Sequence, residues 1–385
     1  QAKAQKGMRT ILNFDAVDWK ADVYVNDIFL GSHTGGFTEF SFDITPYLNV
    51  KGEQKLVVKV ADSSDKSFQP RGKQVLSPKG IWYTPVSGIW QSVWLETVPE
   101  TRFLSYEAVA DIDTKSLTVK TLTKGTAEGD IILAEVLEGG VGYSPEKPAE
   151  KVIASAKAAE GKDVTVTLPE VKTWSPDSPY LYGLRLSVIR GGKVLDRVEG
   201  YAAMREISVV TDSHNYKRMA LNGKPLFQFG PLDQGWWPDG LYTAPTAEAL
   251  VWDVEATKDL GFNMIRKHIK VEPAHWYYAC DRLGMMVWQD MPCIGCYNDR
   301  NQWGQNEDCY GAGSDYWARN EDNMKNYYKE WTEIISQLKK YQSIVVWVPF
   351  NEAWGQFDTK TVADFTKTMD PTRLVNAASG GNWIK

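Results

Sequence analysis

The sequence predicts a multidomain chain: a jelly-roll β-sandwich, an immunoglobulin-like β-sandwich, and then an α/β barrel of the (β/α)8, or TIM, type. Three observations predict this fold class. The chain has 385 residues, which is more than one ordinary domain. Residues 1–211 alternate polar and apolar positions between turn residues and show no helical period. From residue 212, short apolar runs alternate with amphipathic helical patterns, which is typical of a parallel sheet.

Composition argues against several kinds of partner. The net charge is −6, the pI is about 5.5 and no Lys/Arg block is present, so we expect no nucleic-acid partner and no anionic membrane surface. The longest apolar run, residues 344–350, is too short to cross a bilayer. The 16 Trp and 18 Tyr, several beside Gly, Asp or Pro, suit a carbohydrate partner, although large cores also use Trp. Whether the chain forms a homo-oligomer stays open.

Residues 1–98 are predicted to form the first sandwich, with jelly-roll antiparallel strands. Its strands are expected in the alternating segments Ala21–Leu30, Phe37–Ile44, Leu56–Val60 and Ser92–Glu96. Asn26-Asp27 is a tight hairpin signal. Residues 62–88 form a long connection dense in polar and aromatic groups. Long loops in compact domains are functional or disordered, and the aromatic content disfavours disorder, so we expect a functional loop.

Residues 99–211 are predicted to form an immunoglobulin-like sandwich, because turn signals recur about every ten residues. The alternating segments are Ser116–Leu122, Asp130–Val136, Lys162–Leu168 and Tyr180–Ile189. The stretches 125–129, 145–150 and 154–161 are interpreted as solvated turns. No chemical motif occurs here, so a spacer role is expected.

Residues 212–385 are predicted to form part of a barrel, because the large loops follow strand ends only. The expected strands are Leu226–Gly230, Asn263–Lys270, Met285–Trp288, Ile344–Phe350 and Leu374–Ala378. One helix is expected after its cap Thr246 and closes at Gly261, and another runs from Pro273 to Leu283 before Gly284. A longer helix is expected to reach Tyr341.

Polar and aromatic side chains follow every predicted strand, where the carboxyl ends of barrel strands converge on one pocket. Arg266, His268 and Lys270 are expected on one face of the second strand, because strand side chains alternate. The other strand ends supply Asp233, Gln234, Trp236, Asp290, Asn351, Trp354, Asn382 and Trp383. We predict that these residues bind substrate. Two alternatives stay open: Arg266 with Asp290 as a structural ion pair, and Trp236 as part of the core.

The segment that begins at Asn351-Glu352 is the strongest chemical signal. Pro349 removes a backbone donor, so the preceding buried strand should end there. A Glu at this strand end, beside an amide that can hold a sugar hydroxyl and a Trp that can stack on a sugar ring, is a candidate general acid for glycoside cleavage. The alternative interpretation is that Glu352 caps the following helix.

The four cysteines do not define a site. Cys293 and Cys296 lack a second pair and only Cys309 lies in the same predicted loop, so a disulfide or free thiols are expected rather than structural zinc. We assign no metal and no cofactor from the residues. Gln1–Lys6 is not a secretory signal. The protein would be periplasmic or secreted if a signal peptide precedes this chain and cytoplasmic otherwise, so the compartment stays open.

The three modules together resemble glycoside hydrolase family 2, the group of β-galactosidases, β-glucuronidases and β-mannosidases. The resemblance covers essentially the whole chain, and its motifs are highly specific in combination. They are Val23–Gly31, Gly36–Ile44 and Ser87–Glu96 in the first module, Trp174–Tyr182 in the second, and Leu221–Pro225, Leu260–Arg266, Cys280–Trp288 and Trp347–Glu352 in the third.

The resemblance implies a retaining exo-β-glycosidase. Glu352 matches the family's acid/base, Asn351 would hold the 2-hydroxyl of the sugar in the −1 position, and Arg266 matches an active-site arginine. Asp62 falls where galactosidase-like members bring an aspartate of the sandwich loop to the sugar. Some relatives bind Mg²⁺ or Na⁺ near the site, but nothing in this sequence identifies the ligands. After the first barrel strand, Gly-Pro-Leu-Asp-Gln replaces the Asn-Arg-His type of sequence found in many relatives.

A retaining mechanism needs a second carboxylate about 5–5.5 Å from the first. The family carries this nucleophile on the seventh strand, whereas five strands are predicted here. We therefore expect an internal piece of a longer protein, incomplete at both ends, with no hydrolytic turnover on its own. The expected function of the whole is β-galactosidase-like hydrolysis at the non-reducing end of β-linked oligosaccharides. β-Glucuronidase activity, β-mannosidase activity and a carbohydrate-binding pseudoenzyme are the alternatives.

Overall fold

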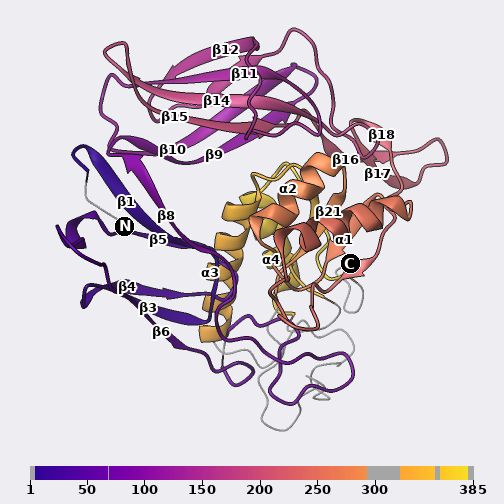
Figure 1. Ribbon diagram of the computed structural model, residues 1–385. Helices are drawn as coiled ribbons and strands as arrows, with labels where there is room; N and C mark the ends of the chain where they lie inside the picture. Colours follow the sequence, from indigo (N-terminus) through magenta and orange to yellow (C-terminus); the bar gives the residue numbers. More distant parts are fainter. Residues whose placement is uncertain (1–4, 68, 293–320, 352–355, 380–385) are drawn as a thin grey trace.

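The computed structural model describes residues 5–67, 69–292, 321–351 and 356–379. It contains two all-β units and one α/β unit. In Figure 1 the first sandwich lies at the left, the immunoglobulin-like sandwich lies across the top, and helices with parallel strands fill the centre. Helix α3 (Glu321–Leu338) lies beside the first sandwich, so the N-terminal unit packs directly on the α/β unit. Among the described residues, no helix has the length and apolarity needed to cross a bilayer.

The first unit is the antiparallel sandwich that the alternation predicted. It has two three-stranded sheets, ordered β5-β1-β8 and β4-β3-β6, and one short pair, β2-β7. Its elements are β1 Met8–Phe14, β2 Val17–Asp18, β3 Lys20–Val25, β4 Ile28–Thr34, β5 Phe40–Asp43, the 3-10 turn η1 Thr45–Tyr47, β6 Leu56–Ala61, β7 Gly88–Ile89 and β8 Val93–Pro99. Strand β1 escaped prediction because Thr10, Ile11 and Leu12 are buried in succession, which breaks the alternation.

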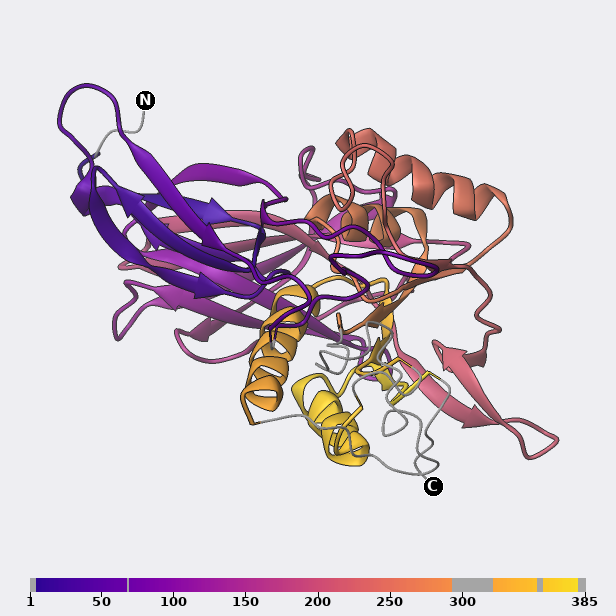
Figure 2. The same ribbon diagram turned by 90° about the horizontal axis from the view of Figure 1, so that it is seen from below.

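The predicted hairpin turn at Asn26-Asp27 is confirmed. Both residues have positive φ, 50° and 65°, which is the backbone that a two-residue turn between twisted strands requires. The turn joins β3 to β4, so the predicted segment Ala21–Leu30 is a hairpin and not one strand. Residues 62–88, between β6 and β7, leave the sandwich and run toward the α/β unit (Figure 2).

The second unit is an immunoglobulin-like sandwich of two sheets, ordered β13-β10-β9 and β12-β11-β14-β15. Its strands are β9 Arg102–Asp111, β10 Ser116–Lys124, β11 Ile131–Val141, β12 Val152–Ala159, β13 Val164–Thr167, β14 Tyr180–Arg190 and β15 Lys193–Ala202. The prediction of a solvated turn at 154–161 is wrong, because β12 occupies most of it. Ala154, Ala156 and Ala158 alternate inward against the core, and alanine gives only a weak strand signal.

The third unit contains the predicted five-stranded parallel sheet of a partial TIM barrel. A three-stranded antiparallel sheet, β16-β17-β18, precedes it, and the parallel order is β19-β20-β21-β22-β23. The strands are β16 Ile207–Thr211, β17 Lys217–Leu221, β18 Lys224–Pro225, β19 Leu232–Asp233, β20 Met264–Lys267, β21 Met286–Asp290, β22 Ile344–Val348 and β23 Leu374–Val375. The helices besides α3 are α1 Ala247–Asp259, α2 Ala274–Leu283 and α4 Thr359–Met369.

The predicted helix caps are confirmed. Thr246 Oγ1 accepts the backbone N–H of Ala249 at 3.1 Å at the start of α1. Gly284 ends α2 in the left-handed conformation, with φ 75°. Helix α3 ends at Leu338 rather than at Tyr341. It buries Trp331, Ile334 and Ile335 in the core that the helices share with the sheet.

The first predicted barrel strand, Leu226–Gly230, is wrong. Parallel pairing begins only at β19, where Leu232 lies opposite Arg266. Phe227 and Phe229 are 81% and 55% exposed, so the apolar run is not a buried strand. The side chain of Asn263 bonds the carbonyl of Phe227 and the N–H of Phe229, and its backbone N–H donates to the carbonyl of Phe229 at 3.0 Å. The second strand is also shorter than expected, since β20 ends at Lys267.

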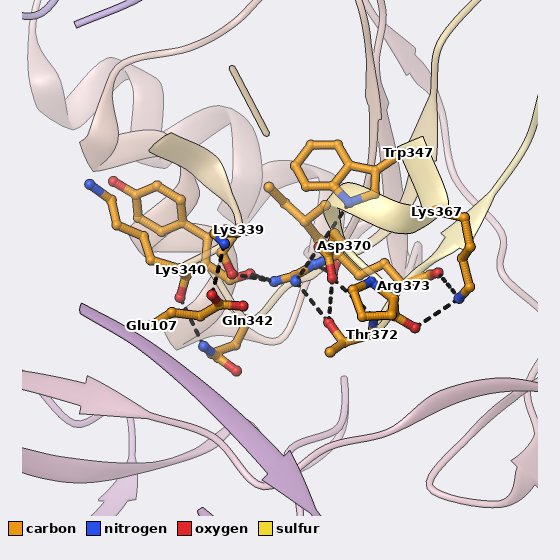
Figure 3. A network of polar contacts seen from close by, with 12 residues as sticks. Glu107, Lys339, Lys340, Gln342, Trp347, Lys367, Asp370, Thr372 and Arg373 are labelled. Carbon is orange, nitrogen blue, oxygen red and sulfur yellow. Dashed lines mark hydrogen bonds and ion pairs between the residues drawn. The ribbon is translucent and has the colours of Figure 1, made fainter. Parts of the chain in front are cut away.

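A buried polar network holds the amino end of β22 (Figure 3). Arg373 donates hydrogen bonds to the carbonyls of Lys339 at 2.7 Å, Tyr341 at 2.6 Å and Ile344 at 2.8 Å. It also pairs with Asp370 at 2.6 Å. Burial works to raise the pKa of the Asp370 carboxyl, but Arg373 and its hydrogen-bond donors hold that pKa well below its usual range.

The same network joins the barrel to the immunoglobulin-like unit. Arg205, which follows β15, donates to the carbonyls of Gln342 at 2.8 Å and Ile344 at 3.1 Å. Burial, and then the neighbouring Arg373, lower the pKa of Arg205 to about 9. Lys339 pairs with Glu107 on β9 at 2.8 Å. The start of β22 is therefore fixed from two units, which positions the strand whose other end carries Asn351.

Candidate active site

Three neighbouring parallel strands end in one hydrogen-bonded cluster. Arg266 on β20 donates both Nε and Nη2 to the carboxylate of Asp290 on β21, at 2.9 and 2.8 Å. Its Nη2 also donates to Oδ1 of Asn351, just after β22, at 3.0 Å. The carboxyl ends of parallel strands meet at one edge, which is why residues 24 and 85 positions away from Arg266 contact it.

His268 completes the cluster. Its Nδ1 lies 2.7 Å from Oδ2 of Asp290, and the side chain of Asp290 is buried. Both oxygens of Asp290 are therefore engaged by protein groups. The structural ion pair considered as an alternative for Arg266 and Asp290 is present, and it lies within the candidate site rather than apart from it. Asp290 therefore orients the side chains of Arg266 and His268 through these hydrogen bonds.

The amide of Asn351 is held in one orientation. Its Oδ1 accepts from Arg266 at 3.0 Å and from Ser379 Oγ at 2.9 Å. Ser379 follows β23, so four strand ends contribute to the cluster. No described residue accepts from the amide nitrogen, which carries two N–H donors for a further partner. A sugar hydroxyl is an acceptor of the required kind.

Lys270 does not join this cluster, although alternation placed it on the same face as Arg266 and His268. Ile269 has φ 48°, a left-handed conformation that ends the alternation after β20. The Nζ of Lys270 donates to the carbonyls of Gly235 at 2.6 Å and Tyr242 at 2.9 Å, and pairs with Glu272 at 3.0 Å. An ammonium has three donors, so all of them are used within the protein.

Lys270 belongs instead to a buried ion cluster of four residues. Lys267 pairs with Asp233 at 2.6 Å and with Glu272 at 2.8 Å, and its Nζ lies 4.3 Å from the ring centre of Trp276. Burial works against the charge of Lys267, but the two carboxylates raise its pKa overall. Burial lowers the pKa of Lys270, and Glu272 opposes this. Burial works to raise the pKa of Asp233, yet Lys267 keeps it below its ordinary value.

The sandwich loop, residues 62–88, contacts the residues that follow β19. Lys73 Nζ donates to Gln234 Oε1 at 2.7 Å. The rings of Tyr83 and Trp236 are stacked, with centres 4.5 Å apart and planes 11° from parallel. Trp236 also contacts the ring of Tyr242 at 4.3 Å. Gln234 and Trp236 thus meet the first sandwich, and Trp236 packs at the edge of the core rather than standing free.

Asp62 is held within its own loop. It accepts from the backbone of Ser64 at 2.7 Å, from Gln69 Nε2 at 2.7 Å and from the hydroxyl of Ser87. Gln69 and Gln74 also donate to Asp18 on β2, at 3.5 and 3.0 Å. Burial, reinforced by the charge of Asp62, raises the pKa of Asp18 to about 8. The hydrogen bonds found for Asp62 among the described residues stay within residues 62–87 and do not reach the strand ends.

Several predicted residues lie outside the described part of the chain: Glu352, Trp354, Asn382, Trp383, Cys293, Cys296 and Cys309. Of the described cysteines, Cys280 is a buried free thiol. Sequence reasoning missed Lys267 and Glu272. A signal existed, because a lysine inside an apolar strand needs a buried carboxylate nearby. Within the described residues, no group of three or more His, Cys, Asp or Glu side chains could hold a metal ion.

Three family models match the chain in order. The sugar binding domain of glycosyl hydrolases family 2 matches residues 1–99, the family 2 domain matches residues 100–205, and the family 2 TIM barrel domain matches residues 214–383. The chain belongs to glycoside hydrolase family 2. The fold class that the alternation and the parallel strands predicted is the fold of this family.

Relatives of this family 2 chain carry two kinds of name. It is 27% identical to a protein of Formosa agariphila that is provisionally named a β-glucuronidase, over 98% of this chain and 33% of the relative. It is 27% identical to a β-galactosidase of Thermoanaerobacter pseudethanolicus, over 77% of this chain and 39% of the relative. The chain thus spans between a third and two fifths of the length of these relatives.

Solved structures show the same fold. A crystal structure described as an FMN-binding β-glucuronidase from Facaelibacterium prausnitzii L2-6 aligns with a TM-score of 0.77 at 20% identity, covering 97% of this chain and 54% of that one. A β-glycosidase structure from Bacteroides vulgatus aligns with a TM-score of 0.71 at 23% identity, covering 96% of this chain and 44% of that one.

Proposed function

We propose that the protein to which this family 2 chain belongs is a retaining exo-β-glycosidase, acting at the non-reducing end of β-linked oligosaccharides. In this mechanism Glu352 protonates the leaving glycosidic oxygen and later activates water. Asn351 holds the 2-hydroxyl of the −1 sugar, and Arg266 lines the same position. A retaining mechanism also needs a second carboxylate about 5–5.5 Å from the first.

The orientation of the Asn351 amide carries this proposal. Arg266 and Ser379 both donate to its oxygen, and no described residue accepts from its nitrogen, so we propose that its N–H groups bind a ligand at the edge where the parallel strands end. In glycosidases, distortion of the sugar and hydrogen bonds to its 2-hydroxyl that strengthen in the transition state together supply several kcal/mol. Glu352 is the next residue along the chain, and we propose that it acts beside Asn351.

The remaining predicted residues take two kinds of role in this proposal. Gln234, Trp236, His268, Trp354, Asn382 and Trp383 are proposed sugar contacts. Asp62, Asp233, Lys270 and Asp290 are engaged with protein groups, so we propose that they orient neighbours and do not touch the sugar. The β-galactoside is the proposed substrate class. A β-glucuronide or a β-mannoside is the alternative.

A substrate screen tests the reaction and the sugar together. The full protein is assayed with aryl β-galactoside, β-glucuronide and β-mannoside, and the expected result is turnover of the β-galactoside. If only another of the three glycosides is turned over, the proposed sugar is wrong and the proposed reaction stands. Binding of oligosaccharide with no turnover of any of the three favours the carbohydrate-binding pseudoenzyme and overturns the proposal.

Glu352→Gln tests the acid/base. Because general acid–base catalysis contributes roughly 10²- to 10⁴-fold, kcat should fall by about that factor while the sugar Kd changes little. The matched control is Glu333→Gln, which removes a part-exposed carboxylate paired with Lys329 on α3. Unchanged kcat in Glu352→Gln would remove this residue from the mechanism.

A further inference from the structure

Residues 233–242, here called the mouth loop, connect β19 to the turn before α1 and lie on the buried ion cluster. Gly235 is the point of contact. Its N–H donates to Asp233 Oδ1 at 2.8 Å, and its carbonyl accepts from Lys270 at 2.6 Å. Its φ is +66°, and a Cβ at this position would lie 2.3 Å from Glu272 Oε1. Both peptide groups of Gly235 are therefore fixed by charged side chains.

The residues on either side of Gly235 contact the first sandwich. Gln234 accepts from Lys73 at 2.7 Å, and Trp236 stacks on Tyr83 at 4.5 Å. The far end of the mouth loop is fixed in the same way, because Lys270 also donates to the carbonyl of Tyr242 at 2.9 Å. The ammonium of Lys270 thus holds both ends of the loop that meets the sandwich.

Lys270 differs from the other charged residues of the ion cluster in where its N–H donors go. Lys267 satisfies the two carboxylates of Asp233 and Glu272. Lys270 directs two of its three donors to backbone carbonyls of the mouth loop and the third to Glu272. No donor remains for a ligand, so any effect of Lys270 on substrate must pass through the loop.

We propose that Lys270 is a positioning residue that holds the mouth loop against the sandwich loop and so sets how Gln234, Trp236 and Tyr83 meet the sugar. The role rests on the proposed glycosidase function for its catalytic consequence. The ordering of the loop does not depend on that function. Lys270 therefore couples the first sandwich to the barrel mouth through backbone carbonyls rather than through substrate contact.

Lys270→Met tests the tether in the full protein that contains this chain. The variant keeps the length of the side chain and removes the three donors. A charged hydrogen bond is worth enough that amide exchange in residues 233–242 and 69–83 should speed up roughly tenfold or more. If the protein is a glycosidase, KM should rise about tenfold while kcat changes less than about threefold, because a loosened loop weakens sugar binding. A merely structural effect differs, since loss of folded enzyme lowers kcat and leaves KM unchanged.

Lys258→Met is the matched control. Lys258 is part-buried and, like Lys270, donates to two backbone carbonyls, those of Pro176 at 2.8 Å and Gly284 at 3.4 Å, away from the mouth loop. It should lower overall stability without faster exchange in residues 233–242. The double variant Lys270→Met, Glu272→Gln relieves the charge left on Glu272 but does not restore the tether, so loop exchange should stay fast.

The outcomes are separable. Unchanged exchange in the mouth loop of Lys270→Met, or restored protection in the double variant, overturns the proposal whatever the enzyme does. Faster loop exchange with an unchanged KM overturns the effect on substrate. Faster loop exchange in a protein with no glycosidase activity leaves the tether standing and counts against the proposed function.

Discussion

Asp290 illustrates how a residue at the centre of a site can serve it without touching a ligand. Both of its oxygens accept from Arg266 or His268, and its side chain is buried. The pair with Arg266 is bidentate, a geometry that fixes the plane of the guanidinium. Asn351 then takes its orientation from the same guanidinium. A change at Asp290 should therefore reach Asn351 through Arg266.

Asp290→Asn should destabilise the protein and lower its activity. The new amide has one acceptor oxygen and cannot accept from both Arg266 and His268. It is also neutral, so the largely buried guanidinium of Arg266 loses its counter-ion. Removing one partner of a buried ion pair costs about 3–5 kcal/mol. Urea denaturation at pH 7 measures this cost.

The control is Asp364→Asn, which removes the exposed pair between Lys360 and Asp364 on α4. An exposed i, i+4 pair contributes about 0.3–0.5 kcal/mol, so this variant should unfold almost like the parent. Equal stability of the two variants would show that the Asp290 cluster does not hold Arg266 as described.

Strand β22 is the element on which the site depends. Its five residues are buried, and its carboxyl end leads into Asn351. Its amino end is held by Arg373 and Arg205, and Trp347 in its middle donates to Asp370 at 2.9 Å. The polar network in Figure 3 thus fixes the amino end of the strand, while the cluster around Arg266 lies at its carboxyl end. A substitution that shifts one end of β22 should therefore displace the residues at the other end.

Arg373→Met should cost about 3–5 kcal/mol at pH 7, because it leaves Asp370 buried without its counter-ion. The cost should shrink in acid. The folded-state pKa of Asp370 lies below its ordinary value, so its stabilising effect is present above the unfolded-state pKa near 4 and is lost as the pH falls. Urea denaturation of parent and variant from pH 7 down to about pH 2.5 measures the difference, and a cost independent of pH would contradict the assignment.

At the scale of the whole molecule, the first sandwich meets the barrel at α3 as well as at the mouth loop. Trp19 Nε1 donates to Glu330 at 3.0 Å, and Gln337 bonds the backbone of Phe37 and Glu39 at 3.0 Å. The second oxygen of Glu330 is buried and has no hydrogen-bond partner among the residues that the structure describes. Burial raises the pKa of Glu330 to about 8, as it does for Asp18 beside Trp19. Two acids with raised pKa values therefore lie at this contact.

The stability of the protein should fall as the pH rises from about 4 to about 8. Between those values the folded state holds protons on Glu330 and Asp18 that the unfolded chain has released, so the free energy of unfolding decreases and then levels off. Each unit of pKa shift corresponds to about 1.36 kcal/mol. Thermal denaturation across pH 5–9 measures the slope.

Glu330→Gln should flatten that slope. The amide still accepts from Trp19, but it cannot ionise. It places an N–H donor where the unpartnered oxygen lies, so a cost that is constant with pH is also expected. Glu333→Gln, on the same helix, should keep the slope of the parent. A parent-like slope in Glu330→Gln would exclude Glu330 as its source.

Sequence patterns were sufficient for much of the fold. Local alternation, the Asn26-Asp27 turn and the helix caps at Thr246 and Gly284 act over a few residues, so they could be predicted. The wrong predictions also come from relying on local patterns. Phe227 and Phe229 form an apolar run without burial, and the alanines of β12 pack inward with little hydrophobic signal. Burial depends on distant partners, which a local pattern does not contain.

The sequence by itself determined the order of two sandwiches and a parallel sheet, and it singled out Arg266, His268, Asp290 and Asn351 because polar groups end buried strands. Only the tertiary structure decided which charges pair. It placed Asp290 with Arg266 and His268, diverted Lys270 to Glu272 and to the mouth loop, and brought Lys73 of the sandwich to Gln234. The physical reason is that a buried charge takes the partner that packing brings within reach, whatever the separation along the chain.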